Sequence, residues 1–385
     1  MHGAAIDSPW RDRKRYGWLL GVVLVGLPCY GWLIAKATGS PLGYWFTPLF
    51  VYGFLPLLDL VLGTDAGNPP DDAVPALARD RYYRRIVYLA LPAVYAMLLF
   101  GAWLSVRGGL AWHEWLGLAF SIGIVSGVSI NLGHELGHQQ APLERLLAKL
   151  ALAPAAYGHF TIEHNRGHHV RVATFEDPAS ARYGESFYRF YPRCAIGGIR
   201  SAIGLERARL AALGRGFWSR ENELLQNWAL TLALYAGLAL WLGPMVLPFL
   251  LLQALYGSSL LETVNYIEQY GLARRRLPDG RYERSTPEHS WNSNHLVSNL
   301  ILYQLQRHSD HHAHASRSYQ ALRHFDDAPQ LPSGYMGMIV LAYVPPIWFR
   351  IMNPRVARHY QGELGRANVA PRQPAFATRP PPSSG

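Results

Sequence analysis

Six long apolar runs, separated by shorter polar segments, organise the first two thirds of the chain. Each run is close to the ~20 residues that an α-helix needs to cross the hydrocarbon core of a bilayer. Tryptophan and tyrosine gather near the ends of the runs, as expected where helices pass the membrane–water interface. The pattern predicts an all-α integral membrane protein with spans at 17–36, 44–63, 86–106, 115–133, 227–243 and 245–264.

Two further apolar stretches are less suited to spanning. Residues 143–160 carry two basic side chains and are short, which favours a re-entrant or interfacial segment; residues 336–352 contain Pro345-Pro346, which favours an interfacial helix pair over a seventh span. We therefore expect one membrane-embedded domain over residues 1–360. Residues 361–385 are predicted to be a disordered Pro- and Ser-rich tail with the composition of a linker.

The basic residues indicate how such a protein is oriented. The chain has 385 residues, of which 16% are charged, and a net charge of +10. If the N-terminus is cytoplasmic and there are six spans, only Lys36 and Arg107 of the 36 basic residues face outward. This asymmetry agrees with the positive-inside rule and predicts that both termini are cytoplasmic. The net positive charge is then explained by basic loops that lie beside anionic lipid headgroups. The sequence contains no nucleic-acid-binding motif.

Histidines are concentrated in three short clusters. The segments HELGH (134–138), EHNRGHH (163–169) and HSDHHAH (308–314) hold nine of the 16 histidines. Spacings of three and four residues place side chains on one face of a helix, and neutral imidazole is the commonest metal ligand among side chains. A single pair is often accidental, but three clusters predict a metal centre. Eight of the nine fit such faces, which is more than one ion needs and indicates two metals.

The chemistry that these clusters permit follows from their ligand type and position. All-imidazole ligation suits iron, copper, zinc or nickel better than magnesium or calcium. The clusters follow or lie outside the spans on the predicted cytoplasmic side, so we expect a helical cap that holds the metals beneath the bilayer. No nucleophile triad or phosphate-binding loop is evident. A metal site beside lipid points to activation of O₂ or water against an apolar substrate, with electrons from a partner.

Carboxylates stand among the histidine clusters. Metal-bound histidine usually donates its second ring N–H to a carboxylate or a carbonyl. We expect the nearby acids to orient the rings, although for Asp177 an ordinary surface role is an equally good interpretation. The candidates are Glu135, Glu163, Asp177, Glu268 and Asp310.

At these motifs the chain resembles the bacterial integral-membrane alkane hydroxylases, the alkane 1-monooxygenases, from the first span to about residue 360. The family's HE-x-GHK box matches 134–139, with Gln139 where lysine is usual, and its EHNxGHH box matches 163–169. Three histidine boxes alone would also fit membrane fatty-acid desaturases. LQRHSDHH at 305–312 together with NYIE-x-YGL at 265–272 favours the hydroxylases.

The resemblance implies six transmembrane helices and a non-haem di-iron centre. Its implied ligands are His134, His138, His164, His168, His169, His308, His311 and His312. It implies O₂-dependent hydroxylation of medium- to long-chain n-alkanes to 1-alkanols in the bacterial inner membrane. Electrons would come from rubredoxin, which an NADH-dependent rubredoxin reductase reduces. A residue in the second span, here Val51, is associated with room for longer chains. The alternative is a membrane fatty-acyl desaturase or a related di-iron hydroxylase of another apolar substrate.

One position departs from the family pattern. The family's fourth motif reads NYIEHYGL and its histidine completes the metal shell, whereas this chain has Gln269 there. An amide oxygen is a weaker ligand than imidazole, so we expect a lower metal occupancy or a lower turnover. His295 and His314 lie outside the family's ligand pattern and are expected to support the site or the fold.

Overall fold

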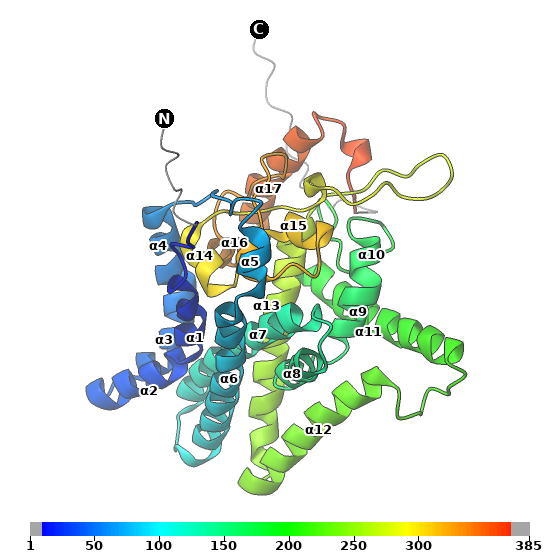
Figure 1. Cartoon of the computed structure of the whole chain (residues 1–385). Coiled ribbons are helices and arrows are strands. Elements are labelled where there is room, and N and C mark those ends of the chain that lie inside the picture. Colours follow the sequence, from blue (N-terminus) through cyan, green and yellow to red (C-terminus); the bar gives the residue numbers. More distant parts are fainter. Residues whose placement is uncertain (1–9, 371–385) are drawn as a thin grey trace, which may run out of the picture.

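Long helices form a bundle, and shorter helices gather at one end of it in the computed structural model, which describes residues 10–370 (Figure 1). The first and last described residues lie at that same end. Within the described residues, strand pairing is limited to isolated bridges, so the predicted all-α class is confirmed. Five helices are long and apolar enough to cross a membrane: Pro41–Leu62, Val74–Arg107, Trp112–Gly137, Glu223–Leu242 and Pro244–Gln269.

Two bent helix pairs raise the number of candidate spans to as many as seven. The first predicted span is one of them: Gly17–Val25 and Leu27–Thr38 meet at 57°. Pro28 stands in the first turn after this break, where it lacks an N–H and its ring excludes a straight continuation. The other pair is Tyr335–Ala342 and Pro345–His359, bent by 120° at the proline pair.

The α-helices have the following bounds. They are α1 Leu20–Val25, α2 Leu27–Thr38, α3 Phe46–Leu49, α4 Leu55–Leu62, α5 Val74–Arg79, α6 Arg81–Arg107, α7 Trp112–Gly137, α8 Pro142–Leu152, α9 Phe160–Glu163, α10 His169–Arg171, α11 Phe187–Ala212, α12 Glu223–Leu242, α13 Leu247–Gln269, α14 Leu296–Ile301, α15 His308–Ala313, α16 Tyr335–Ala342 and α17 Pro345–His359. Two π-helical turns, Phe50–Phe54 and His164–His168, interrupt them.

Helix α7 is the central element, and it packs most closely against α13. A Cβ at Gly257 would lie 2.9 Å from the carbonyl oxygen of Gly123 and 3.1 Å from the amide nitrogen of Gly127. Small residues of this kind let two membrane helices approach backbone to backbone. The polar side chains within α7 are paired: Ser129 donates to the Ala151 carbonyl, and Asn131 donates to the Leu302 carbonyl at 2.9 Å. These contacts hold α7 in one position relative to its neighbours.

Helix α7 is longer than the hydrocarbon core of a membrane is thick. Its 26 residues span about 39 Å at 1.5 Å per residue, whereas the hydrocarbon core is about 30 Å thick. The last turns of α7 and of α13 end together at the end of the bundle that carries the short helices (Figure 1). We call this the histidine end, because His134 and His138 lie there.

The carboxylate of Asp59, which lies inside the second predicted span, accepts hydrogen bonds from the N-terminus of α14. The N–H groups of Val297 and Ser298 donate to its Oδ1 at 2.9 and 3.0 Å, and the Ser298 hydroxyl donates to Oδ2. Asp59 therefore caps the N-terminus of a helix that is distant in sequence. A Cβ at Gly334 would lie 2.2 Å from Asp59 Oδ2, so only glycine fits there.

Replacing Asp59 with alanine is expected to destabilise the protein by about 1–3 kcal/mol, because two buried N–H groups lose their acceptor. Thermal unfolding in detergent measures the change. Asp72→Ala, which removes an exposed acid, is the matched control. Equal melting temperatures for Asp59→Ala and the unmodified protein would contradict this role.

The predicted tail begins later than residue 361. Ala367 and Asn368 are buried, and the Tyr183 N–H donates to the Asn368 carbonyl at 2.6 Å. The Asn368 N–H in turn donates to the Gly271 carbonyl. Backbone pairing therefore holds the chain to residue 370 despite its tail-like composition, and the rest of the predicted tail lies outside the described residues.

Candidate metal centre

All eight predicted histidines come together at the histidine end. Two groups have ligand atoms within 4.8 Å of one another: His134, His138, His164 and His311 form one, and His168, His308 and His312 form the other. His169 belongs with the first group, since its Nε2 lies 3.0 Å from His164 Nε2 and 3.1 Å from His311 Nε2. We call these the five-histidine and three-histidine groups. The two groups adjoin, since the ring centroids of His169 and His312 are separated by 4.6 Å.

Local backbone structure explains why residues five apart share a face in the second cluster. His164–His168 form a π-helical turn, and the His169 N–H donates to the His164 carbonyl. The i→i+5 bond widens the turn, a feature frequent at functional sites. It brings His169 beside His164, which regular α-helical spacing would not do.

Arg307 anchors the third cluster and was not identified from the sequence. It is 2% exposed and donates to the carbonyls of Asp65, Gly67 and Leu322 at 2.8–3.0 Å. Its guanidinium therefore fixes the start of α15 to the loop that follows α4. The only sequence signal was its position directly before His308.

The nitrogen geometry fits metal binding. Two nitrogens bound at right angles, each about 2.1 Å from one ion, stand about 3.0 Å apart. The distance between Nε2 atoms is 2.9 Å for His134 and His311 and 2.8 Å for His308 and His312. Burial lowers the pKa of His164, His308, His311 and His312 well below the usual imidazole value, and neighbouring imidazoles lower it further. The rings are thus neutral, as metal ligands must be.

Two ring nitrogens support the same interpretation. His138 Nε2 and His168 Nε2 are buried and have no hydrogen-bond partner. Buried polar atoms normally find a partner, and a metal ion at each group would supply one. The donors present therefore fit a metal pair.

Asp177 orients one of these rings. His168 Nδ1 donates to Asp177 Oδ2 at 2.9 Å, which leaves Nε2 free for a metal. Burial lowers the pKa of His168, but the charge and hydrogen bond of Asp177 outweigh it and raise the pKa. Of the two interpretations weighed for Asp177, the contacts support ring orientation.

Changing Asp177 to asparagine is expected to weaken metal binding at the three-histidine group by about 10- to 100-fold, as the loss of an orienting carboxylate typically does. Calorimetric titration of metal into the metal-free protein measures this. Glu176→Gln is the matched control, since Glu176 is exposed and accepts a hydrogen bond from the Tyr282 hydroxyl. Unchanged affinity in Asp177→Asn would refute the assigned role.

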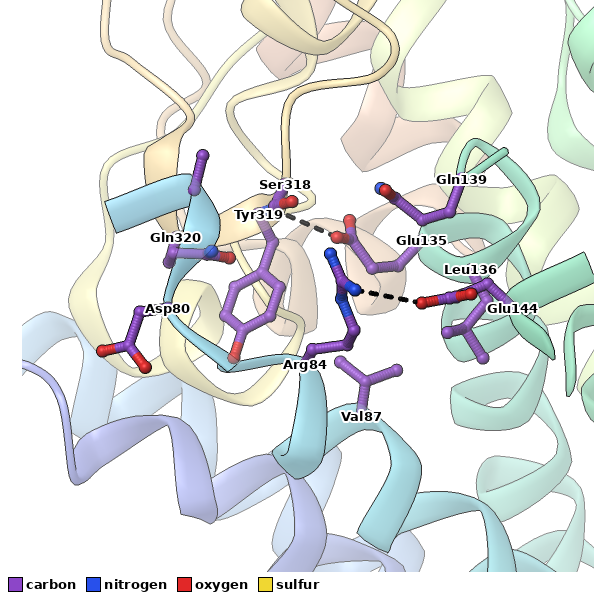
Figure 2. A pocket seen from close by; sticks show the side chains of 11 residues that line it. Asp80, Arg84, Val87, Glu135, Leu136, Gln139, Glu144, Ser318, Tyr319 and Gln320 are labelled. Atoms are coloured by element: carbon purple, nitrogen blue, oxygen red, sulfur yellow. Dashed lines mark hydrogen bonds and ion pairs between the residues drawn. The ribbon is translucent and has the colours of Figure 1, made fainter. Parts of the chain in front are cut away.

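Three of the other predicted acids make polar contacts with groups other than the eight histidines. Glu135 points into a small pocket beside Arg84 and Gln139 (Figure 2), and its Oε1 accepts from the Tyr319 N–H at 3.2 Å. Neighbours one residue apart on a helix do not share a face, so Glu135 diverges from His134. Glu163 pairs with Arg171, and Asp310 with Arg317 and His314. None of these contacts orients a ring of the eight.

Glu268 and Gln269 end α13 next to the three-histidine group. Glu268 Oε2 lies 3.0 Å from His308 Nε2, and the Tyr335 hydroxyl donates to Oε1 at 2.8 Å. Gln269 is fully buried, and neither of its amide atoms has a partner. His295 and His314 remain outside both groups; His295 Nδ1 contacts Ser293 Oγ at 2.8 Å.

A small cavity beside His164 and His168 contains residues that were not predicted. Tyr157, His159, Glu262 and Asn265 line it. The Tyr157 hydroxyl and the Asn265 amide donate to the buried Glu262 carboxylate. An acid inside an apolar run was the available signal for Glu262, because ionisable residues in spans usually have a function.

Comparisons with known proteins agree with this arrangement. The fatty acid desaturase family matches residues 110–342, a range that includes all three histidine clusters. Alkane 1-monooxygenase 1 of Alcanivorax borkumensis is 48% identical over 368 residues, which cover 95% of this chain and 91% of that protein. Alkane 1-monooxygenase of Acinetobacter baylyi is 44% identical over 376 residues, covering 94% and 90%.

A more distant relative is the xylene/toluene monooxygenase hydroxylase component XylM of Pseudomonas putida. It is 28% identical over 276 residues, which cover 69% of this chain and 71% of that protein. The apolar helices and these relatives make the chain a multi-pass membrane protein with a histidine-rich metal site. From the identity and coverage of the nearer relatives, the chain belongs to the alkane 1-monooxygenase family.

Proposed function

We propose that this protein uses O₂ to hydroxylate the terminal methyl group of medium- to long-chain n-alkanes, and that its eight clustered histidines hold two iron ions. The observation that carries the proposal is the pair of adjoining groups of imidazoles, spaced as ligands of one ion each. The activity for which the relatives are named supports the substrate class. The location of the groups at the end of an apolar bundle suits an alkane that enters from lipid.

Iron bound at these groups would supply the activation of O₂. The protein's own residues position that chemistry and restrict water. Asp177 holds one ring in its binding tautomer, and Arg307 fixes the helix that carries the third cluster. The buried, apolar surroundings of α7 and α13 favour an alkane over water.

We further infer that rubredoxin delivers the electrons and is itself reduced by an NADH-dependent rubredoxin reductase. His169 and His312 are partly exposed, and Val170 beside them is 65% exposed, so a carrier can approach the metals there. A hairpin over residues 274–284 projects from the histidine end (Figure 1), and Arg274 donates to the Val170 carbonyl at 2.7 Å. Its arginines favour a carrier with negative charge.

The proposed location is the bacterial inner membrane with both termini in the cytoplasm. The excess of basic residues in the loops on the histidine side supports this orientation. It places the histidine end where a soluble electron carrier can reach it.

Val51 is proposed to limit the length of the alkane. It is buried within the π-helical turn Phe50–Phe54. Val51→Trp is expected to lower the ratio of 1-dodecanol to 1-octanol by at least about tenfold, since bulk in an apolar pocket discriminates by chain length. Gas chromatography of products from mixed alkanes measures the ratio. Leu60→Trp, at an exposed position of α4, is the control, and an unchanged ratio in Val51→Trp would exclude this role.

The test of the proposed function is product analysis with purified protein, rubredoxin, rubredoxin reductase, NADH, O₂ and octane. We expect 1-octanol, formed in a one-to-one ratio with the NADH consumed. With a fatty-acyl substrate, a double bond in place of an alcohol would instead support a desaturase. Absence of any octane product from iron-loaded protein would overturn the assigned substrate.

A further inference from the structure

We propose that Glu268 is a direct metal ligand at the three-histidine group, where its carboxylate supplies the donor that Gln269 does not. The inference rests on the metal pair proposed above and assigns Glu268 a different role from the ring orientation expected from the sequence. It begins from an imbalance: one group has five imidazoles and the other has three. An ion at the smaller group needs at least one further donor.

The position of the carboxylate separates a ligand from an orienting group. An orienting carboxylate binds the ring nitrogen that faces away from the metal, as Asp177 does at Nδ1 of His168. Glu268 instead lies against Nε2 of His308, the nitrogen that also faces His312. An ion held between these two Nε2 atoms would have Glu268 on its own side of the His308 ring.

The distances agree with shared coordination. His308 Nε2 stands 3.0 Å from Glu268 Oε2 and 2.8 Å from His312 Nε2. Donors at right angles around one ion, each about 2.1 Å from it, are separated by about 3.0 Å. His308 Nε2 thus has the Glu268 carboxylate oxygen and His312 Nε2 each at the spacing of neighbouring ligands.

The buried carboxyl group of Glu268 has few other partners. The side chain is 1% exposed, and within residues 10–370 no lysine or arginine pairs with it. Its other oxygen accepts only the Tyr335 hydroxyl. A buried carboxylate is costly unless it is paired or coordinates a metal, and a divalent ion at this point would balance it.

The residue next to Glu268 gives a further reason to assign Glu268 as a ligand of the ion at the three-histidine group. Gln269 is uncharged, buried and without hydrogen-bond partners, so it neither neutralises Glu268 nor supplies an imidazole. A carboxylate on the preceding residue is the remaining strong donor. The resulting site has three nitrogens and one oxygen, and so differs chemically from its five-nitrogen neighbour.

The test is the metal content of Glu268→Gln, an isosteric change, after loading with Fe²⁺ and, separately, with Co²⁺. The unmodified protein is expected to bind two ions per chain and the variant about one, with loss of part of the Co²⁺ visible absorption. The double variant with Gln269→His is expected to regain the second ion through an imidazole. Glu144→Gln, which changes a buried carboxylate on α8 away from the histidines, should keep both ions.

Each alternative has a distinct result. Two ions and an unchanged Co²⁺ spectrum in Glu268→Gln would overturn the ligand assignment and leave the proposed metal pair intact. Fewer than two ions in the unmodified protein would instead contradict the metal pair. If Glu268 were only structural, the metal-free variant would unfold at a lower temperature than the metal-free parent or fail to fold. A ligand role predicts at least equal stability of the metal-free variant.

Discussion

Replacing His311 with alanine is expected to abolish alkane hydroxylation and to remove one of two metal ions. His311 Nε2 lies 2.9 Å from His134 Nε2 and 3.1 Å from His169 Nε2, so it joins the cluster of α7 to that of the π-helical turn. Residues that merely support a ligand change affinity or activity by about 10- to 100-fold. Loss of a ligand at this central point should exceed that range.

Metal analysis and an octane assay on the same preparation measure both effects. His314→Ala is the matched control, because His314 lies on the same short segment and contacts Asp310 instead of the other histidines. We expect the control to keep two ions and activity within about twofold, since surface changes are usually small. Full activity in His311→Ala would contradict the ligand role, and equal losses in both variants would indicate a general disturbance of α15.

Changing Gln269 to histidine is expected to raise metal affinity, and with it the metal occupancy at limiting Fe²⁺, and to raise turnover. The unmodified side chain is buried at the end of α13, beside Glu268, with both amide atoms unpaired. An imidazole at this position would add a nitrogen donor next to the three-histidine group. Even supporting residues alter metal affinity by about tenfold, so a gain of at least that size is expected.

Titration with limiting Fe²⁺, followed by the rate of 1-octanol formation, tests this prediction. Gln269→Leu is the control because it keeps similar bulk and removes both amide atoms. Only the histidine variant should gain affinity. Identical iron content and rate in Gln269→His and the unmodified protein would show that position 269 does not reach the metals.

The spans were predictable because hydropathy and length act locally. Five of the six predicted runs coincide with helices able to cross a membrane. The remaining run, 17–36, forms two helices that meet at 57° next to Pro28. This angle depends on packing as well as on the proline. For example, Gly21 of α1 approaches Tyr303, a contact between residues far apart in the chain. Such contacts are absent from a hydropathy pattern.

The site was predictable to the level of residue type but not of role. The eight histidines met as expected, since helical spacing and cluster composition are local properties. The roles of the acids could not be predicted, because they depend on the direction of each side chain. Glu135 adjoins His134 in sequence yet diverges from it, whereas Glu268 reaches His308 from another helix.

Asp59 shows the same limit at longer range. Its carboxylate caps a helix more than 200 residues away, and that helix leads into the third cluster. From sequence it was only an acid within an apolar run. Its role becomes visible when α4 and α14 are placed side by side.

The central claim is that this chain holds two iron ions on its eight histidines. The most direct test is the metal content of purified, iron-loaded protein together with its Mössbauer spectrum. We expect about two irons per chain in two unequal environments, one with more nitrogen donors than the other. One iron per chain, or a single zinc in place of iron, would contradict it.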